Sequence, residues 1–190
     1  MTKLDHIAKR PATYDDVRAA PRHMVAELIH GALVLHPRPA SPHARAASAL
    51  GPKIGGPFDY DEDGPGGWWI LDEPELHLGG HVLVPDLAGW RRERMPAVPR
   101  AAFFQTPPDW ACEVLSPSTR SHALTDKRAI YLREGVRHLW LVDPDARILE
   151  AFHASAEGWT LRGVAEDADT VALEPFEAAP FALRSLWIPD

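Results

Sequence analysis

Apolar residues in this chain gather in short runs bounded by glycine, proline and charged residues, a pattern typical of strands joined by turns. The runs at residues 24–29 and 32–36 flank His30-Gly31 and predict an N-terminal β-hairpin with a two-residue turn. Alternation within the first run places Glu27 on the same face as two apolar residues. Its carboxylate is therefore expected to point into the structure.

Helical signals lie on both sides of this hairpin. Thr13 can cap a short helix over residues 13–20, and Ser41 is the candidate cap of a second helix over residues 43–54. The stretch at 55–67, rich in glycine, proline and acidic residues, predicts a surface loop. Further strands are expected at residues 68–71, 75–78 and 82–90, and an antiparallel hairpin at the edge of the sheet is expected from residues 148–153 and 158–164.

Residues 108–144 predict two buried strands joined by a helix, and the first strand carries one ionisable residue, Glu113. The helix, which Ser118 or Ser121 can cap, has an apolar stripe that faces the sheet, and Lys127 lies on this stripe. Two continuously apolar strands joined by one helix imply a right-handed parallel crossover covered on both faces. We therefore expect Glu113 and Lys127 to meet near the carboxyl end of the first strand.

The length and composition of the chain are those of a soluble globular protein. A chain of 190 residues and 21.0 kDa fits one domain, residues 1–190. The single cysteine, Cys112, excludes a disulfide framework and a cysteine zinc site, and predicts a reducing, cytoplasmic location. No apolar run approaches about 18 residues, so no membrane association is expected. The apolar tail at 173–190 should pack on the domain or on a second copy, and we expect a homodimer.

The net charge of -7 and a pI near 5.8 give no general attraction to phosphate groups. Any contact with nucleic acid must come from a local basic surface or from a bound metal ion. Arg91, Arg92 and Arg94 form one candidate surface, although such a cluster is most often a solvated turn.

A second acid, Asp86, follows an apolar run and Pro85. If Asp86 and Glu113 share a site, their carboxylates repel by roughly 4 kcal/mol at 4 Å and an effective dielectric constant near 20, so a cation is needed beside them. Divalent ions with oxygen ligands fill this role, and a lysine nearby can orient water or stabilise charge on phosphorus. The combination of Asp86, Glu113 and Lys127 therefore suits phosphodiester hydrolysis.

Structural explanations compete for the same residues. Glu113 could be a buried acid paired with Lys127 or Arg128, and Asp86 could begin a turn, as Pro-Asp pairs often do. Asp109, in a second Pro-Asp pair, is expected to cap the exposed start of its strand, and His43 can simply open a helix.

Several motifs resemble a known family. They are PD at 85–86, EVLSPST at 113–119, the lysine of TDKRAIY, GVRHLWLVDP at 135–144, ELIHG at 27–31, PRPASPH at 37–43 and VPDLAGWRRERMP at 84–96. Together they resemble the large bacterial Uma family of restriction-endonuclease-like proteins, a branch of the PD-(D/E)XK nuclease superfamily. The likeness covers nearly the whole chain. It implies an α/β fold with α+β mixing, in which helices flank a central mixed β-sheet and an N-terminal β-hairpin precedes it.

The resemblance also implies roles. Asp86 and Glu113 would be ligands of Mg²⁺ or Mn²⁺, the backbone carbonyl of Val114 a further ligand, Lys127 the catalytic lysine and Glu27 an extra acid. One departure from the superfamily pattern is Leu115, which stands two residues after Glu113 where a lysine is usual. The family is thought to draw its lysine from the following helix, which agrees with the inward position of Lys127.

Two functions follow as expectations. The first is a metal-dependent endonuclease that hydrolyses phosphodiester bonds of nucleic acid, with DNA as the expected partner. The alternative is a catalytically silent nuclease-like domain that binds nucleic acid or protein, which the acidic net charge favours.

Overall fold

The computed structural model describes residues 10–37, 40–116 and 120–189, so the candidate cap Ser118 lies outside the described residues. Its helical segments are α1 (Tyr14–Arg18), α2 (Ser41–Phe58), α3 (Arg120–His122), the π-helical turn η1 (Ala123–Lys127), α4 (Arg128–Arg133) and the 3-10 turn η2 (Leu183–Leu186). The strands are β1 (Met24–Ile29), β2 (Ala32–Pro37), β3 (Trp68–Asp72), β4 (Leu76–Leu78), β5 (His81–Leu83), β6 (Leu87–Arg91), β7 (Trp110–Val114), β8 (His138–Asp143), β9 (Ile148–Ser155), β10 (Gly158–Glu166), β11 (Thr170–Val171) and β12 (Phe181–Ala182).

The centre of the fold is a six-stranded mixed sheet in the order β10-β9-β8-β7-β6-β3. The β7–β8 pair is parallel, and the other neighbours are antiparallel. Residues 148–155 and 158–166 form the predicted hairpin, with β10 at the edge of the sheet. This arrangement confirms the expected mixed sheet flanked by helices.

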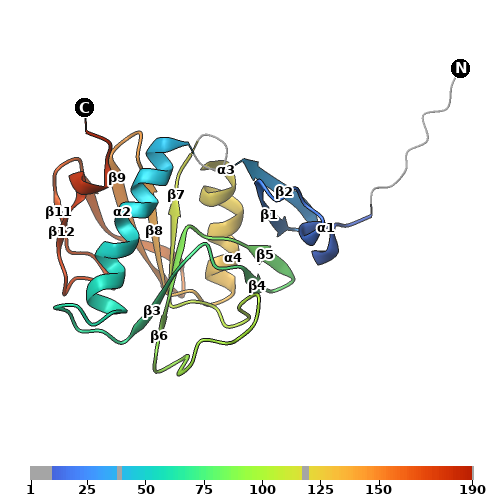
Figure 1. Cartoon of the computed structure of the whole chain (residues 1–190), viewed down its shortest axis with the longest axis horizontal. Coiled ribbons are helices and arrows are strands. Elements are labelled where there is room, and N and C mark those ends of the chain that lie inside the picture. The colour runs from blue at the N-terminus through green and yellow to red at the C-terminus, as the bar shows by residue number, and fades with distance from the viewer. Residues whose placement is uncertain (1–9, 38–39, 117–119, 190) are drawn as a thin grey trace, which may run out of the picture.

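Helices cover the two faces of the central sheet. Leu50 and Ile54 of α2 share one core cluster with Trp110 of β7, whereas Tyr131 of α4 belongs to a second cluster with Ala111. Side chains alternate between the two faces along a strand, so Glu113 shares the face of Ala111, the one that α4 covers. Figure 1 shows α2 and α4 on either side of β7.

A smaller four-stranded sheet, in the order β2-β1-β5-β4, holds the N-terminal hairpin against the domain. The hairpin pairs as predicted, and His30 and Gly31 both have positive φ angles, 50° and 74°, which a type I′ turn requires. The hairpin projects on the side of the domain away from β11 and β12 (Figure 1). Its inner face carries Glu27 toward the central sheet, where the side chain is 2 % exposed.

The helix after β7 ends as expected, because Gly135 has φ +86° directly after the C-cap Glu134. Its middle differs from a plain α-helix. A π-helical turn covers Ala123–Lys127, and such turns are rare and frequent at functional sites. Lys127 closes this turn and is 4 % exposed, so the lysine does lie on the buried stripe.

The C-terminal segment packs on its own chain. Phe176, Leu186 and Trp187 belong to the same core cluster as α2, and the ring of Phe176 lies 4.8 Å from that of Trp110. Of the two places expected for the apolar tail, the structure shows the first.

Two predicted elements are wrong in their bounds. The helix expected over residues 43–54 begins at Ser41, has Ala40 rather than Ser41 as its N-cap, and continues to Phe58, so the predicted loop at 55–67 begins later. The reason is a stripe at every fourth position, Leu50, Ile54 and Phe58, which continues the buried face beyond Gly55.

The single strand expected at residues 82–90 is two strands in different sheets, β5 and β6. Pro85 has no backbone N–H to donate to a strand partner, and the chain leaves one sheet there and enters the other. Asp86 therefore lies in the bend before β6 rather than within a strand.

The position of Asp109 also differs from expectation. Asp109 is 1 % exposed, and its carboxylate accepts hydrogen bonds from the backbone N–H of Arg91 at 2.9 Å and from Arg94 at 2.6 Å. It is a buried acid and does not cap an exposed strand end.

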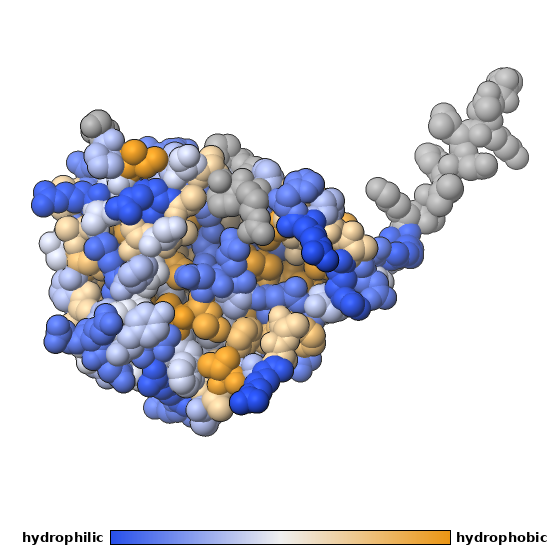
Figure 2. Space-filling model, in the orientation of Figure 1, coloured by the Kyte–Doolittle hydropathy of each residue, from blue (hydrophilic) through white to orange (hydrophobic). Residues whose placement is uncertain are grey.

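The visible surface mixes polar and apolar side chains (Figure 2). Within the described ranges, no helix has the length and apolar character needed to cross a membrane.

Candidate active site

A buried ion-pair cluster lies where the crossover helix meets β7. The ammonium group of Lys127 is 2.8 Å from Oε2 of Glu113 and 2.7 Å from Oε1. It also lies 3.0 Å from Oε1 of Glu27 and donates to the backbone carbonyl of Val84 at 3.0 Å. One cation thus joins the hairpin, the strand β7 and the segment before Pro85.

Glu27 and Glu113 each have further donors. Glu27 lies 3.1 Å from Nε2 of His36 and accepts the backbone N–H of Val84 at 2.7 Å. Glu113 accepts the hydroxyl of Tyr131 at 2.6 Å. Buried carboxylates need such partners, because an unpaired charge in the interior costs several kcal/mol.

Asp86 reaches the same place from the bend before β6. Its Oδ2 accepts the backbone N–H of Val114 at 2.7 Å, which fixes the aspartate beside Glu113, and its Oδ1 lies 3.0 Å from Nε2 of His43. His43 comes from the first turn of α2 and is 8 % exposed. The side chain of Asp86 is 14 % exposed, so solvent reaches it more than it reaches Glu113.

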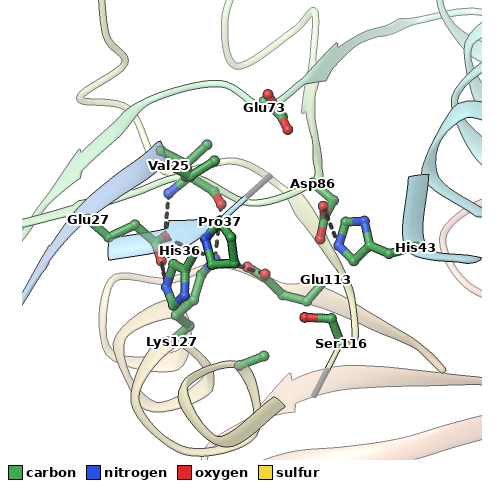
Figure 3. A pocket seen from close by; sticks show the side chains of 12 residues that line it. Val25, Glu27, His36, Pro37, His43, Glu73, Asp86, Glu113, Ser116 and Lys127 are labelled. Atoms are coloured by element: carbon green, nitrogen blue, oxygen red, sulfur yellow. Dashed lines mark hydrogen bonds and ion pairs between the residues drawn. The ribbon is translucent and has the colours of Figure 1, made fainter. Parts of the chain in front are cut away.

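These groups line one pocket, with Glu27 and Lys127 on one side and Glu73 and Asp86 on the other (Figure 3). Its free volume is about 50 Å³, enough for a few water molecules. Carboxylates come from the hairpin, from the segment after β3, from the bend before β6 and from β7. The pocket is therefore rich in oxygen ligands and poor in cations.

Burial and neighbouring charges separate the acids by pKa. Burial raises the pKa of Glu113 to about 7, against the effect of Lys127 and with that of Asp86 and Glu27. Burial alone would also raise the pKa of Glu27, but Lys127, His36 and the Val84 N–H outweigh it and lower the pKa to about 2. Burial would lower the pKa of Lys127, yet the charges of Glu113 and Glu27 raise it, so the lysine stays protonated.

The pKa of His43 is raised as well. Burial opposes this, but the hydrogen bond to Asp86 and the negative charges of Asp86 and Glu113 outweigh it. The imidazole is thus held toward its charged form beside Asp86.

The structure brings together the four side chains expected at the catalytic site, Glu27, Asp86, Glu113 and Lys127, with Val114 contributing its backbone to the same place. Two neighbours escaped that reasoning, namely His36 and Tyr131, while His43, expected simply to open a helix, also contacts Asp86. His36 stands opposite Val25 in the hairpin register, which the turn position fixes, so its nearness to Glu27 could have been inferred. Tyr131 lies four residues after Lys127, a spacing that places both on one helix face.

The arginines near β6 serve internal contacts. Arg92 donates to the carbonyl of Trp68 at 2.9 Å and pairs with Asp59 at 3.0 Å, and Arg94 pairs with Asp109. The guanidinium of Arg91 stacks 4.5 Å over Trp68. These contacts favour a structural role for the cluster over a free phosphate-binding surface.

Comparison with known proteins places this arrangement in context. The sequence profile of the Uma2 family, described as "Putative restriction endonuclease", matches residues 12–184. A search of curated proteins gave no match. Among solved structures, one described as the crystal structure of a putative nuclease belonging to DUF820 from Anabaena variabilis ATCC 29413 is similar, with a TM-score of 0.74 and 23% sequence identity over 93% of this chain and 97% of that chain.

At that identity the structural likeness shows a shared fold. The profile match spans nearly the whole chain, from the cap of α1 to η2. The chain therefore belongs to the Uma2 family of restriction-endonuclease-like proteins.

Proposed function

We propose that this protein is a metal-dependent endonuclease that hydrolyses phosphodiester bonds of nucleic acid, DNA in the first instance. The observation that carries the proposal is a lysine buried between two carboxylates beside a third, more exposed carboxylate in one pocket. Membership of the family described as "Putative restriction endonuclease" supports the same reaction class.

The donor set of the pocket fits a divalent cation. Asp86 and Glu113 offer carboxylate oxygens, the ligands that Mg²⁺ and Mn²⁺ prefer, and Glu73 lines the same pocket. Burial, together with the negative charges of Asp86 and Glu27, raises the pKa of Glu113 to about 7 despite Lys127. A cation held between Asp86 and Glu113 would stabilise both carboxylates in their ionised form.

In this proposal Asp86 and Glu113 hold Mg²⁺ or Mn²⁺, and the carbonyl of Val114 is a further ligand. When bound, such an ion lowers the pKa of a coordinated water and stabilises charge on a phosphate. The Val114 N–H and His43 keep the Asp86 carboxylate in place from two directions.

Lys127 acts through its charge. Because its pKa is raised, Lys127 keeps its proton at neutral pH and cannot act as a general base, so it is assigned to orient the attacking water and to stabilise developing negative charge. Glu27, with a pKa of about 2, stays ionised and holds Lys127 in position from the hairpin side. Glu27 is thus a positioning residue.

The alternative is a nuclease-like domain that binds nucleic acid or protein without cutting. One observation favours it, because both carboxylate oxygens of Glu113 already have partners. Lys127 contacts both oxygens, and Tyr131 donates a hydrogen bond to Oε1. A bound metal must then compete with Lys127 for Glu113.

Cleavage of plasmid and single-stranded substrates with Mg²⁺ or Mn²⁺ separates the two functions. The parent is compared with Lys127→Ala and with Lys53→Ala, whose ammonium group lies on α2, 5.7 Å from the ring centre of Phe181. The endonuclease proposal predicts cleavage by the parent and Lys53→Ala and its loss in Lys127→Ala. Equal cleavage by all three, or by none with folded protein, would rule it out.

The homodimer and the cytoplasmic location stay predictions. The tail that motivated the dimer packs on its own chain, while Leu161 and Val164 on the edge strand β10 remain 49% and 43% exposed. Light scattering decides between one copy and two.

A further inference from the structure

A second group of ligand-type side chains lies away from the candidate active site. His138 begins β8, His153 lies near the end of β9, and Glu174 lies between β11 and β12. His138 and His153 are direct partners in the β8–β9 register, and His138 is also paired with Trp110. Partners point to the same face, so this group lies on the face of Trp110, opposite to that of Glu113.

The two sites also lie at opposite ends of the parallel pair. His138 stands beside Trp110 at the start of β7, and Glu113 stands three residues further along that strand, roughly 10 Å at the usual rise. The C-terminal segment that carries Glu174, between β11 and β12, lies on the side of the domain away from the β1–β2 hairpin (Figure 1).

The atoms of this group are arranged as ligands. One nitrogen from each histidine and a carboxylate oxygen of Glu174 lie within 4.8 Å of one another. Within the described residues, Nδ1 of His138 is buried and makes no hydrogen bond, and His138 as a whole is only 9 % exposed. Nδ1 of His153 lies 3.3 Å from Oε2 of Glu174. Buried polar atoms normally have a partner, so the ring nitrogen of His138 requires an explanation.

We propose that His138, His153 and Glu174 bind a divalent transition-metal ion, with Zn²⁺ as the preferred ion. Two imidazoles and one carboxylate are a ligand set of zinc and its first-row neighbours, whereas Mg²⁺ favours oxygen ligands alone. The ion supplies a partner for Nδ1 of His138 and replaces the direct 3.3 Å contact between His153 and Glu174.

The surroundings prepare the site. Oε1 of Glu174 accepts a hydrogen bond from Arg162 at 3.1 Å, which leaves Oε2 for the ion, and the backbone carbonyl of Glu174 accepts Trp140 Nε1 at 2.7 Å.

Binding requires a small closure. Tetrahedral ligands about 2.1 Å from zinc lie roughly 3.4 Å apart, so the widest of the present gaps must shorten by about 1.4 Å. The side chains of His153 and Glu174 are 42% and 30% exposed, so they can move and the ion can enter from solvent. The bound ion would join β8 and β9 to the segment between β11 and β12, and so fasten that segment to the sheet.

The test uses metal-stripped full-length protein and Zn²⁺ alone, by calorimetric titration and by thermal unfolding. Ligand variants are His153→Gln and Glu174→Gln, whose side chains are partly exposed. His23→Gln is the matched control, because His23 is exposed at the start of the hairpin. Asp86→Asn separates this site from the proposed catalytic one.

The expected result is one equivalent of Zn²⁺ bound by Asp86→Asn with a higher Tm on binding, and the same tight equivalent in the parent and His23→Gln, besides any Zn²⁺ held at Asp86. In His153→Gln and Glu174→Gln the affinity falls at least about tenfold and the Tm shift is lost. Mg²⁺ at the same concentration leaves the Tm of Asp86→Asn unchanged. The proposal is overturned if the parent binds no Zn²⁺, or if the two ligand variants bind it as tightly as the control.

Discussion

The ammonium group of Lys127 lies 2.8 Å and 2.7 Å from the two carboxylate oxygens of Glu113, and both side chains are almost fully buried. This pair joins the middle of the crossover helix to the strand that the helix follows. Glu27 contacts the same ammonium group from the hairpin, so the pair also links the two sheets of the fold. The predictions below follow from this arrangement.

Removing the lysine charge should destabilise the protein strongly. Lys127→Met leaves Glu27 and Glu113 buried without their shared cation, and losing one partner of a buried pair costs about 3–5 kcal/mol. We expect the free energy of unfolding in urea at pH 8 to fall by that amount. Lys53→Met, on the surface of α2, should change it by less than about 1 kcal/mol. A loss in Lys127→Met no larger than in this control would contradict the buried pair.

The hydroxyl of Tyr131 should contribute to stability through Glu113. Tyr131→Phe removes the 2.6 Å hydrogen bond and keeps the ring, so the free energy of unfolding is expected to fall by about 1.5–3 kcal/mol. Tyr60 is 66% exposed, and Tyr60→Phe should have an effect within about 0.5 kcal/mol. Chemical denaturation of both variants is the measurement, and equal midpoints would refute the contact.

His43 should matter for metal affinity more than for folding. Its Nε2 lies 3.0 Å from the Oδ1 of Asp86, and residues that orient a metal ligand typically contribute about 10–100-fold in affinity. His43→Ala is therefore expected to weaken Mn²⁺ binding by that factor in calorimetry, with His23→Ala unchanged. Unaltered Mn²⁺ affinity in His43→Ala would separate the histidine from the proposed metal site.

Acid should weaken the fold partly through Glu27. A carboxyl group whose pKa is lower in the folded state stabilises above its unfolded pKa of 4.5, and this contribution is lost as pH falls toward the folded value of about 2. At pH 3 the expected loss from Glu27 alone is about 2 kcal/mol. Denaturant unfolding of the parent between pH 6 and pH 3 should show this slope.

Glu27→Gln removes the titrating group and should flatten the pH dependence by the same amount, although it lowers stability at pH 6. A parallel fall of stability in parent and variant between pH 6 and pH 3 would show that Glu27 does not titrate in this window.

The sequence predicted most elements because hydrophobic periodicity and turn residues are local signals. The hairpin around His30-Gly31, the strands on either side of the crossover helix and the stop at Gly135 all follow from such signals. The end of α2 at Phe58 and the break at Pro85 depend on which sheet or core receives the chain, and local patterns do not contain that information.

The candidate site was predictable to a similar degree. The inward stripe placed Lys127 against the sheet, and alternation placed Glu27 inside. The link between His43 and Asp86 joins α2 to the bend before β6, two segments far apart in the chain, so no local pattern could reveal it. The π-helical turn at Ala123–Lys127 contains neither glycine nor proline, so no turn residue marks it in the sequence.

The position of a manganese ion in crystals soaked in Mn²⁺ tests the central claim most directly. The account predicts an anomalous peak about 2.0–2.3 Å from a carboxylate oxygen of both Asp86 and Glu113, with the ammonium group of Lys127 beside it. A map from crystals in millimolar Mn²⁺ with no peak between these two carboxylates would contradict the proposed metal site and the reaction assigned to it.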